Sequence, residues 1–171
     1  KYIAWISGDD SMLPEKLNRQ VEYMESDPEC VFTYHDLDCF EDSTGKTNKL
    51  SQQSRQYTLS GNLHTILKYG HITGSSSLMV RNKKTIYFDT RIPLASDWLY
   101  LVDLLYPDGK FHYIDEVLGR YRRHDLSVTR SKAEACNIDL INSMTIAAFK
   151  YRQYSSQILQ KQYLKYVTLG L

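Results

Sequence analysis

The chain has 171 residues, of which 42% are hydrophobic and 24% charged, which describes one globular domain of ordinary size. Its 21 Lys and Arg residues nearly balance its 20 Asp and Glu residues, so the net charge of +1 excludes a broad basic surface for nucleic acid. No stretch approaches the roughly 20 uninterrupted apolar residues that a membrane helix needs. The cysteines, Cys30, Cys39 and Cys136, lack the spacing of a zinc site or a disulfide framework, which favours reduced thiols in the cytoplasm.

The first predicted element is a strand over 1–6, because this apolar run is typical of a buried strand in a parallel sheet. A polar turn over 7–11 follows it. Pro14 is then well placed as the first residue of a helix, which is predicted to end at Asp27-Pro28. The residues at helical spacing that should form its apolar face are Leu13, Leu17, Val21 and Met24.

The rest of the chain is predicted to alternate strands and helices. In order, we expect a strand over 31–37, a surface loop over 41–56, a helix over 62–69, a strand over 76–81 and a helix from 96 or 97 to about 106. A strand pair or a bend over 111–114 and 117–122 comes next, and the chain is helical from about residue 132. The last helix should bury one face, formed by Ile138, Ile141, Thr145, Ala148 and Phe149.

Two adjacent carboxylates, Asp9 and Asp10, stand on the polar turn after the first strand. In open α/β sheets, ligands bind where strands end. Such a pair suits a hard divalent cation, Mg²⁺ or Mn²⁺, which also takes phosphate oxygens from a substrate. The alternative is a solvated turn that caps the helix after it.

Two further segments carry candidate chemistry. Asp97, beside Trp98 at the start of a predicted helix, is either a positioned general base or a plain helix cap. In the basic segment 120–125, arginines could clamp a diphosphate and His124 could bind a metal; the alternative is a basic surface strand.

In this order and at these intervals, the segments resemble family 2 glycosyltransferases with the GT-A fold. Residues 2–21 are similar to the family's metal-binding segment, in which an Asp-rich turn precedes a Pro-x-Lys-Leu motif and a Gln-Val motif; the matching residues are Pro14, Lys16, Leu17, Gln20 and Val21. Residues 74–81 resemble the acceptor-side strand, 95–98 the segment of the catalytic base, and 121–124 the closing Tyr-Arg-x-His motif. The resemblance covers residues 1–130, and the helical tail matches only loosely.

The resemblance implies an α/β fold, with a mixed sheet and flanking helices. Residues 1–130 would be the metal-binding and acceptor-side part of a GT-A domain, and 131–171 a C-terminal helical segment. The implied activity is an inverting, metal-dependent transfer of a sugar from a nucleotide-diphosphate sugar to a hydroxyl of a glycan or lipid-linked acceptor. It further implies polysaccharide or cell-envelope glycan synthesis in the cytoplasm, and leaves open a peripheral association with the inner face of the membrane.

The resemblance also assigns roles to residues. Asp97 would be the catalytic base; Asp9, Asp10 and His124 would hold Mn²⁺ or Mg²⁺; Arg122 and Arg123 would bind the donor diphosphate; Ser75, Ser76 and Trp98 would face the acceptor. Two positions depart from the family pattern, because Ser7 stands where the Asp-rich turn usually begins with Asp, and Ser96 stands where Glu usually precedes the base.

The family's nucleotide-binding half, about 90 residues in three βα units, would precede the Asp-rich turn and is not in this sequence. Both ends of the chain look cut, and we expect the chain by itself to be inactive. Two other functions remain open at this point. One is a non-catalytic carbohydrate-binding or interaction remnant, and the other is a nucleotidyltransferase, which also places carboxylates at strand ends.

Overall fold

The computed structural model describes residues 1–53 and 58–169. The strands are β1 (Tyr2–Ala4), β2 (Ser11–Met12), β3 (Cys30–Glu41), β4 (Thr47–Lys49), β5 (Gly61–Asn62), β6 (Met79–Arg81) and β7 (Lys110–Arg123). The α-helices are α1 (Lys16–Ser26), α2 (Leu63–Tyr69), α3 (Asp97–Leu105), α4 (Val128–Ser131), α5 (Ala133–Lys150) and α6 (Ser155–Leu169). Short 3₁₀ turns are η1 (Leu50–Gln53), η3 (Ser75–Ser77) and η4 (Arg152–Tyr154).

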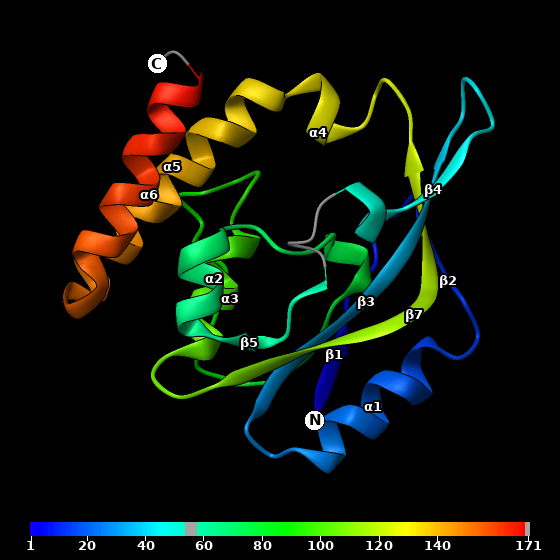
Figure 1. The fold of residues 1–171 in the computed structure, drawn as a ribbon, viewed down its shortest axis with the longest axis horizontal. Helices are drawn as coiled ribbons and strands as arrows, with labels where there is room; N and C mark the ends of the chain where they lie inside the picture. Colours follow the sequence, from blue (N-terminus) through cyan, green and yellow to red (C-terminus); the bar gives the residue numbers. More distant parts are fainter. Residues whose placement is uncertain (54–57, 170–171) are drawn as a thin grey trace.

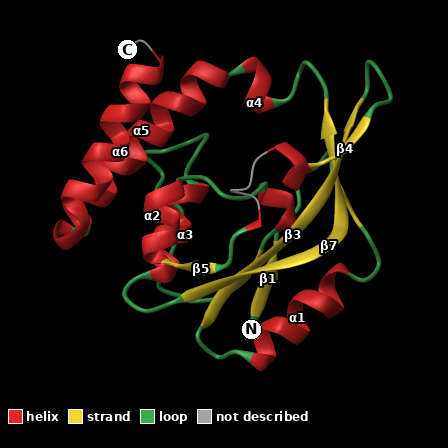
Figure 2. Cartoon of the chain, viewed as in Figure 1, coloured by secondary structure: helices red, strands yellow, loops and turns green. Residues whose placement is uncertain are grey.

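The described part of the chain forms one curled mixed sheet with helices on both faces, as predicted (Figures 1 and 2). The strand order is β1-β6-β3-β7-β2, with β4 paired to β3 and β5 paired to β7. Among these strands, β3 and β7 pair in parallel and the other pairs are antiparallel. Helix α1 lies on one face, and α2, α3, α5 and α6 gather on the other (Figure 1).

The main core lies between the sheet and the helices α2, α3 and α5. Phe32 of β3 and Phe111 of β7 stand opposite each other in register, and their rings stack with centroids 4.9 Å apart. Trp98, at the start of α3, is 1% exposed and belongs to the same core. Burying such aromatic side chains contributes strongly to stability, so this layer holds α3 in place.

Helix α1 buries a face that shares only Met24 with the predicted one. Its buried side chains are Lys16, Gln20 and Met24, whereas Leu17 is 48% exposed and Val21 is 36% exposed. The prediction was right for Met24 and wrong for Leu17 and Val21, because it counted apolar side chains, while the segments beneath α1 offer backbone carbonyls that need donors.

Lys16 and Gln20 supply those donors. The Lys16 ammonium nitrogen donates to the carbonyl oxygens of Trp5, at 2.9 Å, and Ser76, at 2.6 Å. The Gln20 side-chain nitrogen donates to the carbonyl oxygen of Ser77, at 2.9 Å. Burial lowers the pKa of Lys16 to about 8, against the opposing charge of Asp10. One helix therefore ties the end of β1 to η3.

The prediction of a buried parallel strand at the start of the chain was wrong for the described residues. β1 pairs antiparallel with β6 and is an edge strand, with one neighbour among the described strands. The side chain of Ile3 is accordingly 42% exposed. An apolar run indicates that a segment is at least partly buried, but it does not determine which strands pair with it or in which direction.

Several predicted boundaries also moved. β3 continues to Glu41, and β4 and η1 occupy part of the predicted loop, whose residues 54–57 lie outside the described part. η3 replaces the start of the strand predicted over 76–81. The two segments predicted over 111–122 are one strand, β7, whose pairing with β3 shifts register between Ile114 and Val117.

The helix predicted over 62–69 is confirmed as α2. Asn62 caps it: its side chain accepts a hydrogen bond from the backbone N–H of His64, and the side-chain hydroxyl of Thr65 accepts one from the Asn62 N–H. Gly70 ends the helix with a φ of 83°, in the region that favours glycine.

The predicted helical tail is confirmed, but its buried face was predicted only in part. Ile141 and Ala148 of α5 are buried, whereas Ile138 is 42% and Phe149 77% exposed. The buried face includes the polar Asp139 and Ser143, which bond to the segment before α3. None of the described helices combines the length and the hydropathy needed to cross a bilayer.

The replacement Lys16→Met tests the polar anchor of α1. It should lower the free energy of unfolding by about 2 to 3 kcal/mol, because two buried carbonyl groups lose their donor while the side-chain volume is nearly kept. Chemical denaturation followed by circular dichroism measures this. Lys84→Met, at an exposed lysine, is the matched control and should change stability by less than about 0.5 kcal/mol. Equal effects of the two replacements would contradict the anchor.

Candidate active site

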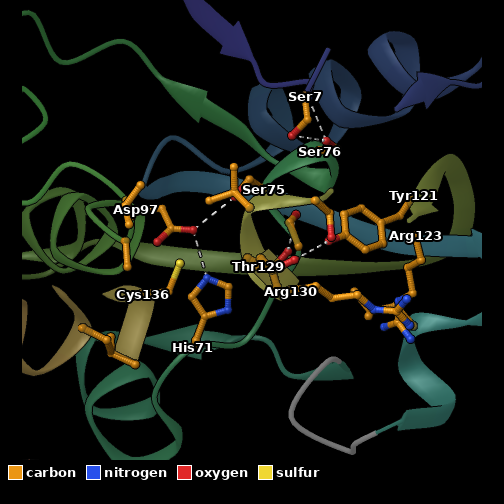
Figure 3. A pocket seen from close by; sticks show the side chains of 18 of the residues that line it. Ser7, His71, Ser75, Ser76, Asp97, Tyr121, Arg123, Thr129, Arg130 and Cys136 are labelled. Atoms are coloured by element: carbon orange, nitrogen blue, oxygen red, sulfur yellow. Dashed lines mark hydrogen bonds and ion pairs between the residues drawn. The ribbon is translucent and has the colours of Figure 1, made fainter. Parts of the chain in front are cut away.

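A pocket of about 750 Å³ opens between η3, the start of α3, the end of β7 and the helices α4 and α5 (Figure 3). Asp97 and His71 lie on one side of it, and Arg123 and Arg130 on the other (Figure 3). Apolar side chains complete the wall: Leu37, Leu50, Pro93, Leu94, Val128 and Leu140. A cavity with apolar walls and a few converging polar groups is the usual form of a small-molecule site.

Asp97 is held by three groups of the chain. Its Oδ2 atom lies 3.0 Å from His71 Nε2 and accepts a hydrogen bond from Ser75 Oγ at 3.1 Å. Its Oδ1 atom accepts from the backbone N–H of Trp98 at 2.9 Å. Burial acts to raise the pKa of Asp97, but the charge and hydrogen bond of His71, with the two other donors, outweigh it and lower the pKa to about 2. The carboxylate is therefore ionised at neutral pH.

Helix α5 positions the segment that leads into Asp97. Asp139 Oδ2 accepts a hydrogen bond from the backbone N–H of Leu94 at 2.7 Å, and Ser143 Oγ donates to the carbonyl oxygen of Ala95 at 3.3 Å. Asp97 then begins α3, where the helix dipole favours a negative charge. The N-cap of α3 is Ser96, so Asp97 is not the plain cap that the sequence left open. Asp97 lines the pocket, and its role as a general base stays a prediction.

The two carboxylates of the turn after β1 have different surroundings. Both oxygens of Asp10 are occupied: Oδ2 accepts from Ser76 Oγ, and Oδ1 accepts from the backbone N–H of Arg122 at 2.9 Å. Asp9 is more exposed, and its Oδ2 lies 2.9 Å from His124 Nε2. The hydrogen bond from His124 lowers the pKa of Asp9. Asp10 thus ties the turn to η3 and β7, and Asp9 and His124 form a separate pair.

Among the described residues, no group of three His, Cys, Asp or Glu side chains is arranged to hold a metal ion. The three predicted ligands are therefore not all gathered at one point. Asp9 and His124 are in contact, and these two donors suit an ion that takes its remaining ligands from a diphosphate and water. Such an incomplete set is usual for Mg²⁺ or Mn²⁺ bound together with a phosphate substrate.

Two consecutive serines connect Asp97 to the turn that carries Asp9 and Asp10, the carboxylate turn. Ser75 bonds to Asp97, while Ser76 bonds to Asp10 and accepts a hydrogen bond from the backbone N–H of Ser7 at 2.9 Å. Ser76 Oγ also lies 3.2 Å from Ser7 Oγ. The serine at position 7, where the resembled pattern has Asp, thus takes part in this contact and lines the pocket.

The remaining predicted site residues lie in three different places. The guanidinium of Arg122 forms an ion pair with Asp42, with Nη2 and Oδ2 2.5 Å apart, so it points away from the pocket that Arg123 lines. Ser75 and Ser76 line the pocket, and their contact with an acceptor stays a prediction. Trp98 does not, because the first turn of α3 directs its ring into the core. The prediction that Trp98 faces an acceptor is therefore wrong in this structure.

Sequence reasoning missed several residues of the pocket. His71 had no partner at a recognisable spacing, yet it bonds to Asp97, 26 positions away along the chain. Tyr121 and Arg130 also line the pocket, as does the Cys136 thiol near Asp97 (Figure 3). The segment Gly74–Arg81 was a usable signal for Ser75 and Ser76; no comparable local pattern surrounds His71.

Comparison with known proteins shows a similarity in sequence to one protein and a similarity in fold to another. No family model matches the chain. It is 30% identical over 129 residues to the uncharacterized glycosyltransferase MJ1057 of Methanocaldococcus jannaschii, covering 71% of this chain and 42% of that protein. The chain is therefore similar to a glycosyltransferase in sequence.

The fold is similar to that of S. aureus TarS, residues 1–349, with a TM-score of 0.59, 13% identity and coverage of 98% of this chain and 47% of TarS. TarS in complex with UDP gives a TM-score of 0.53, with 12% identity and coverage of 84% and 40%. The chain spans less than half the length of each of these proteins.

A pair of replacements distinguishes the two carboxylates of the turn. Asp10→Ala should lower the free energy of unfolding by about 1 to 3 kcal/mol, because Ser76 and the Arg122 N–H lose their acceptor. Asp9→Ala should change it by less than about 1 kcal/mol, because exposed ion pairs contribute little. Thermal and urea unfolding without added metal measure both. Equal losses for the two variants would contradict the separate roles.

Proposed function

We propose that this chain is the acceptor-side part of an inverting glycosyltransferase that uses a nucleotide-diphosphate sugar and a divalent cation. The observation that carries the proposal is the ionised carboxylate of Asp97 on the wall of the pocket, linked through Ser75 and Ser76 to the carboxylate turn. The sequence similarity to a glycosyltransferase and the fold shared with TarS support it. UDP, which is bound in one TarS structure, is the natural first probe of the donor.

The proposed chemistry is a single displacement. The acceptor oxygen forms a bond to the anomeric carbon of the donor sugar while the bond from that carbon to the diphosphate oxygen breaks. The electron pair of the broken bond leaves with the nucleoside diphosphate, and attack from the opposite side inverts the configuration. Asp97 accepts the proton of the acceptor hydroxyl as the attack proceeds. The reacting sugar has oxocarbenium character, as in glycoside hydrolysis.

The other residues would bind and orient the two substrates. Asp9 and His124 would hold Mn²⁺ or Mg²⁺, which when bound supplies positive charge to the leaving diphosphate. Arg123, on the side of the pocket opposite Asp97, would add positive charge for the donor (Figure 3). The apolar wall would exclude water around the acceptor. A glycan or lipid-linked acceptor and a role in polysaccharide or cell-envelope glycan synthesis belong to the same proposal.

Asp97→Asn should reduce sugar transfer by the intact protein about 10²- to 10⁴-fold, because an amide cannot accept the acceptor proton. Calorimetry with UDP and Mn²⁺ should show donor-side affinity unchanged within about threefold. Transfer and hydrolysis are measured with a panel of radiolabelled UDP-, GDP- and dTDP-sugars. Asp108→Asn, at an exposed carboxylate just beyond α3, is the matched control and should leave transfer unchanged.

Retention of most transfer by Asp97→Asn would show that another group is the base. A wild-type protein that neither transfers nor hydrolyses any sugar of the panel would contradict the enzymatic function itself, and would favour a non-catalytic carbohydrate-binding or interaction module.

Asp9→Asn should weaken the metal-dependent binding of UDP by about tenfold or more, which corresponds to about 1.4 kcal/mol. The reason is that a neutral amide is a poorer ligand than a carboxylate for a hard cation. Calorimetric titration of UDP into the intact protein, with Mn²⁺ and with EDTA, measures the difference. Asp115→Asn, on β7 away from the turn, is the control. An unchanged metal requirement in Asp9→Asn would place the metal elsewhere.

A further inference from the structure

His71 is the titratable group in direct contact with Asp97. It follows Gly70 at the end of α2, and its side chain is 36% exposed, so the ring forms part of the pocket wall. Nε2 lies 3.0 Å from Asp97 Oδ2, and Figure 3 shows the ring below the carboxylate, with Ser75 above it. The ring and Ser75 together hold the Oδ2 atom of Asp97.

The two ring nitrogens have different surroundings. A carboxylate only accepts hydrogen bonds, so Nε2 must carry a hydrogen in both the neutral and the protonated ring. Neutral and charged His71 therefore differ at Nδ1. Among the described residues, Nδ1 has no hydrogen-bond partner, so the ring can gain or lose a proton there without breaking its contact with Asp97.

The charge of His71 alters what Asp97 can do. When His71 is protonated, its positive charge stabilises the Asp97 carboxylate and makes it a weaker base. When His71 is neutral, the hydrogen bond from Nε2 keeps the carboxylate oriented, but the stabilising charge is gone. With the same contact between the two side chains, neutral His71 thus favours proton acceptance by Asp97, and protonated His71 opposes it.

We propose that His71 is a positioning residue for Asp97, and that the neutral ring is the form in which the Asp97 carboxylate accepts the proton of the acceptor hydroxyl. The inference rests on the proposed function, because it concerns the same transfer. The proton moves from the acceptor oxygen to Asp97 as that oxygen bonds to the anomeric carbon and the diphosphate leaves; His71 exchanges no proton in this step.

The groups around His71 decide the pH range of the effect. Burial acts to lower the pKa of His71, but the charge and the hydrogen bond of Asp97 from α3 outweigh it and raise the pKa above its usual value. Lys165 of α6 acts in the opposite direction. Burial raises the pKa of the Cys136 thiol from α5, so it adds no charge near neutral pH. Transfer should therefore be fast above the pKa of His71 and should fall as the pH drops below it.

The test compares His71→Gln with the wild type in the intact protein. The glutamine amide can donate to Asp97 at a reach similar to that of Nε2, but it does not titrate. In the wild type, kcat/KM should fall about tenfold for each pH unit below the pKa of His71. In His71→Gln this fall should disappear, while kcat/KM at pH 8.5 stays within about tenfold of the wild type. His64→Gln, at an exposed histidine of α2, should keep the wild-type profile.

Two outcomes would overturn the inference. If His71→Gln keeps the wild-type fall at low pH, another group causes it. If His71→Gln is folded by circular dichroism but inactive at every pH, a neutral hydrogen-bond donor is not sufficient at this position, and the role assigned to the neutral ring is wrong.

A second measurement does not depend on transfer. The His71 ring is titrated by NMR in the wild type and in Asp97→Asn, and its pKa should be lower in the variant, because the charge that stabilises the protonated ring is removed. An unchanged pKa would overturn the pairing. A wild type that transfers no sugar but shows this shift would contradict the proposed function and leave the coupling of His71 to Asp97 established.

Discussion

The buried polar face of α1 is the constraint on which the rest of the site depends. Lys16 and Gln20 donate hydrogen bonds to backbone carbonyls of η3, and Lys16 also bonds to the carbonyl of Trp5 at the end of β1. Short irregular segments such as η3 have few backbone partners of their own, so their position depends on donors from elsewhere. Burying the Lys16 ammonium group is unfavourable unless hydrogen bonds replace its contacts with water. Helix α1 is therefore held where Lys16 can reach both carbonyl groups.

Because η3 is held in this way, two of its three serines can bond to two different carboxylates at once. Ser76 bonds to Asp10 on the turn after β1, and Ser75 bonds to Asp97 at the start of α3. The proposed donor side and the proposed base are therefore connected through consecutive residues. The proposed displacement needs the leaving group and the base at a set distance, and this link of two residues would help to set it.

The C-terminal helices take part in the site as well. Asp139 and Ser143 of α5 hold the segment that leads into Asp97. Cys136, Asn137 and Leu140 of the same helix line the pocket. The helical segment that follows the resembled region therefore shapes the side of the pocket where an acceptor would lie. Its side chains are natural candidates for acceptor selectivity, since contacts to the non-reacting part of a substrate discriminate between substrates.

Local patterns in the sequence were enough to place α2, α3 and the helical tail: Asn62 and Gly70, for example, mark the ends of α2. The fold class and the choice of Ser75, Ser76, Asp97 and Arg123 as site residues came from the resemblance of motifs at fixed intervals, and the structure places these four residues on one pocket. The tertiary structure alone decided that α1 buries Lys16 and exposes Leu17, that Trp98 belongs to the core, and that His71 meets Asp97. The physical reason is that these outcomes depend on which carbonyls and charges come together from distant parts of the chain, and hydrophobic periodicity carries no record of a hydrogen-bond partner.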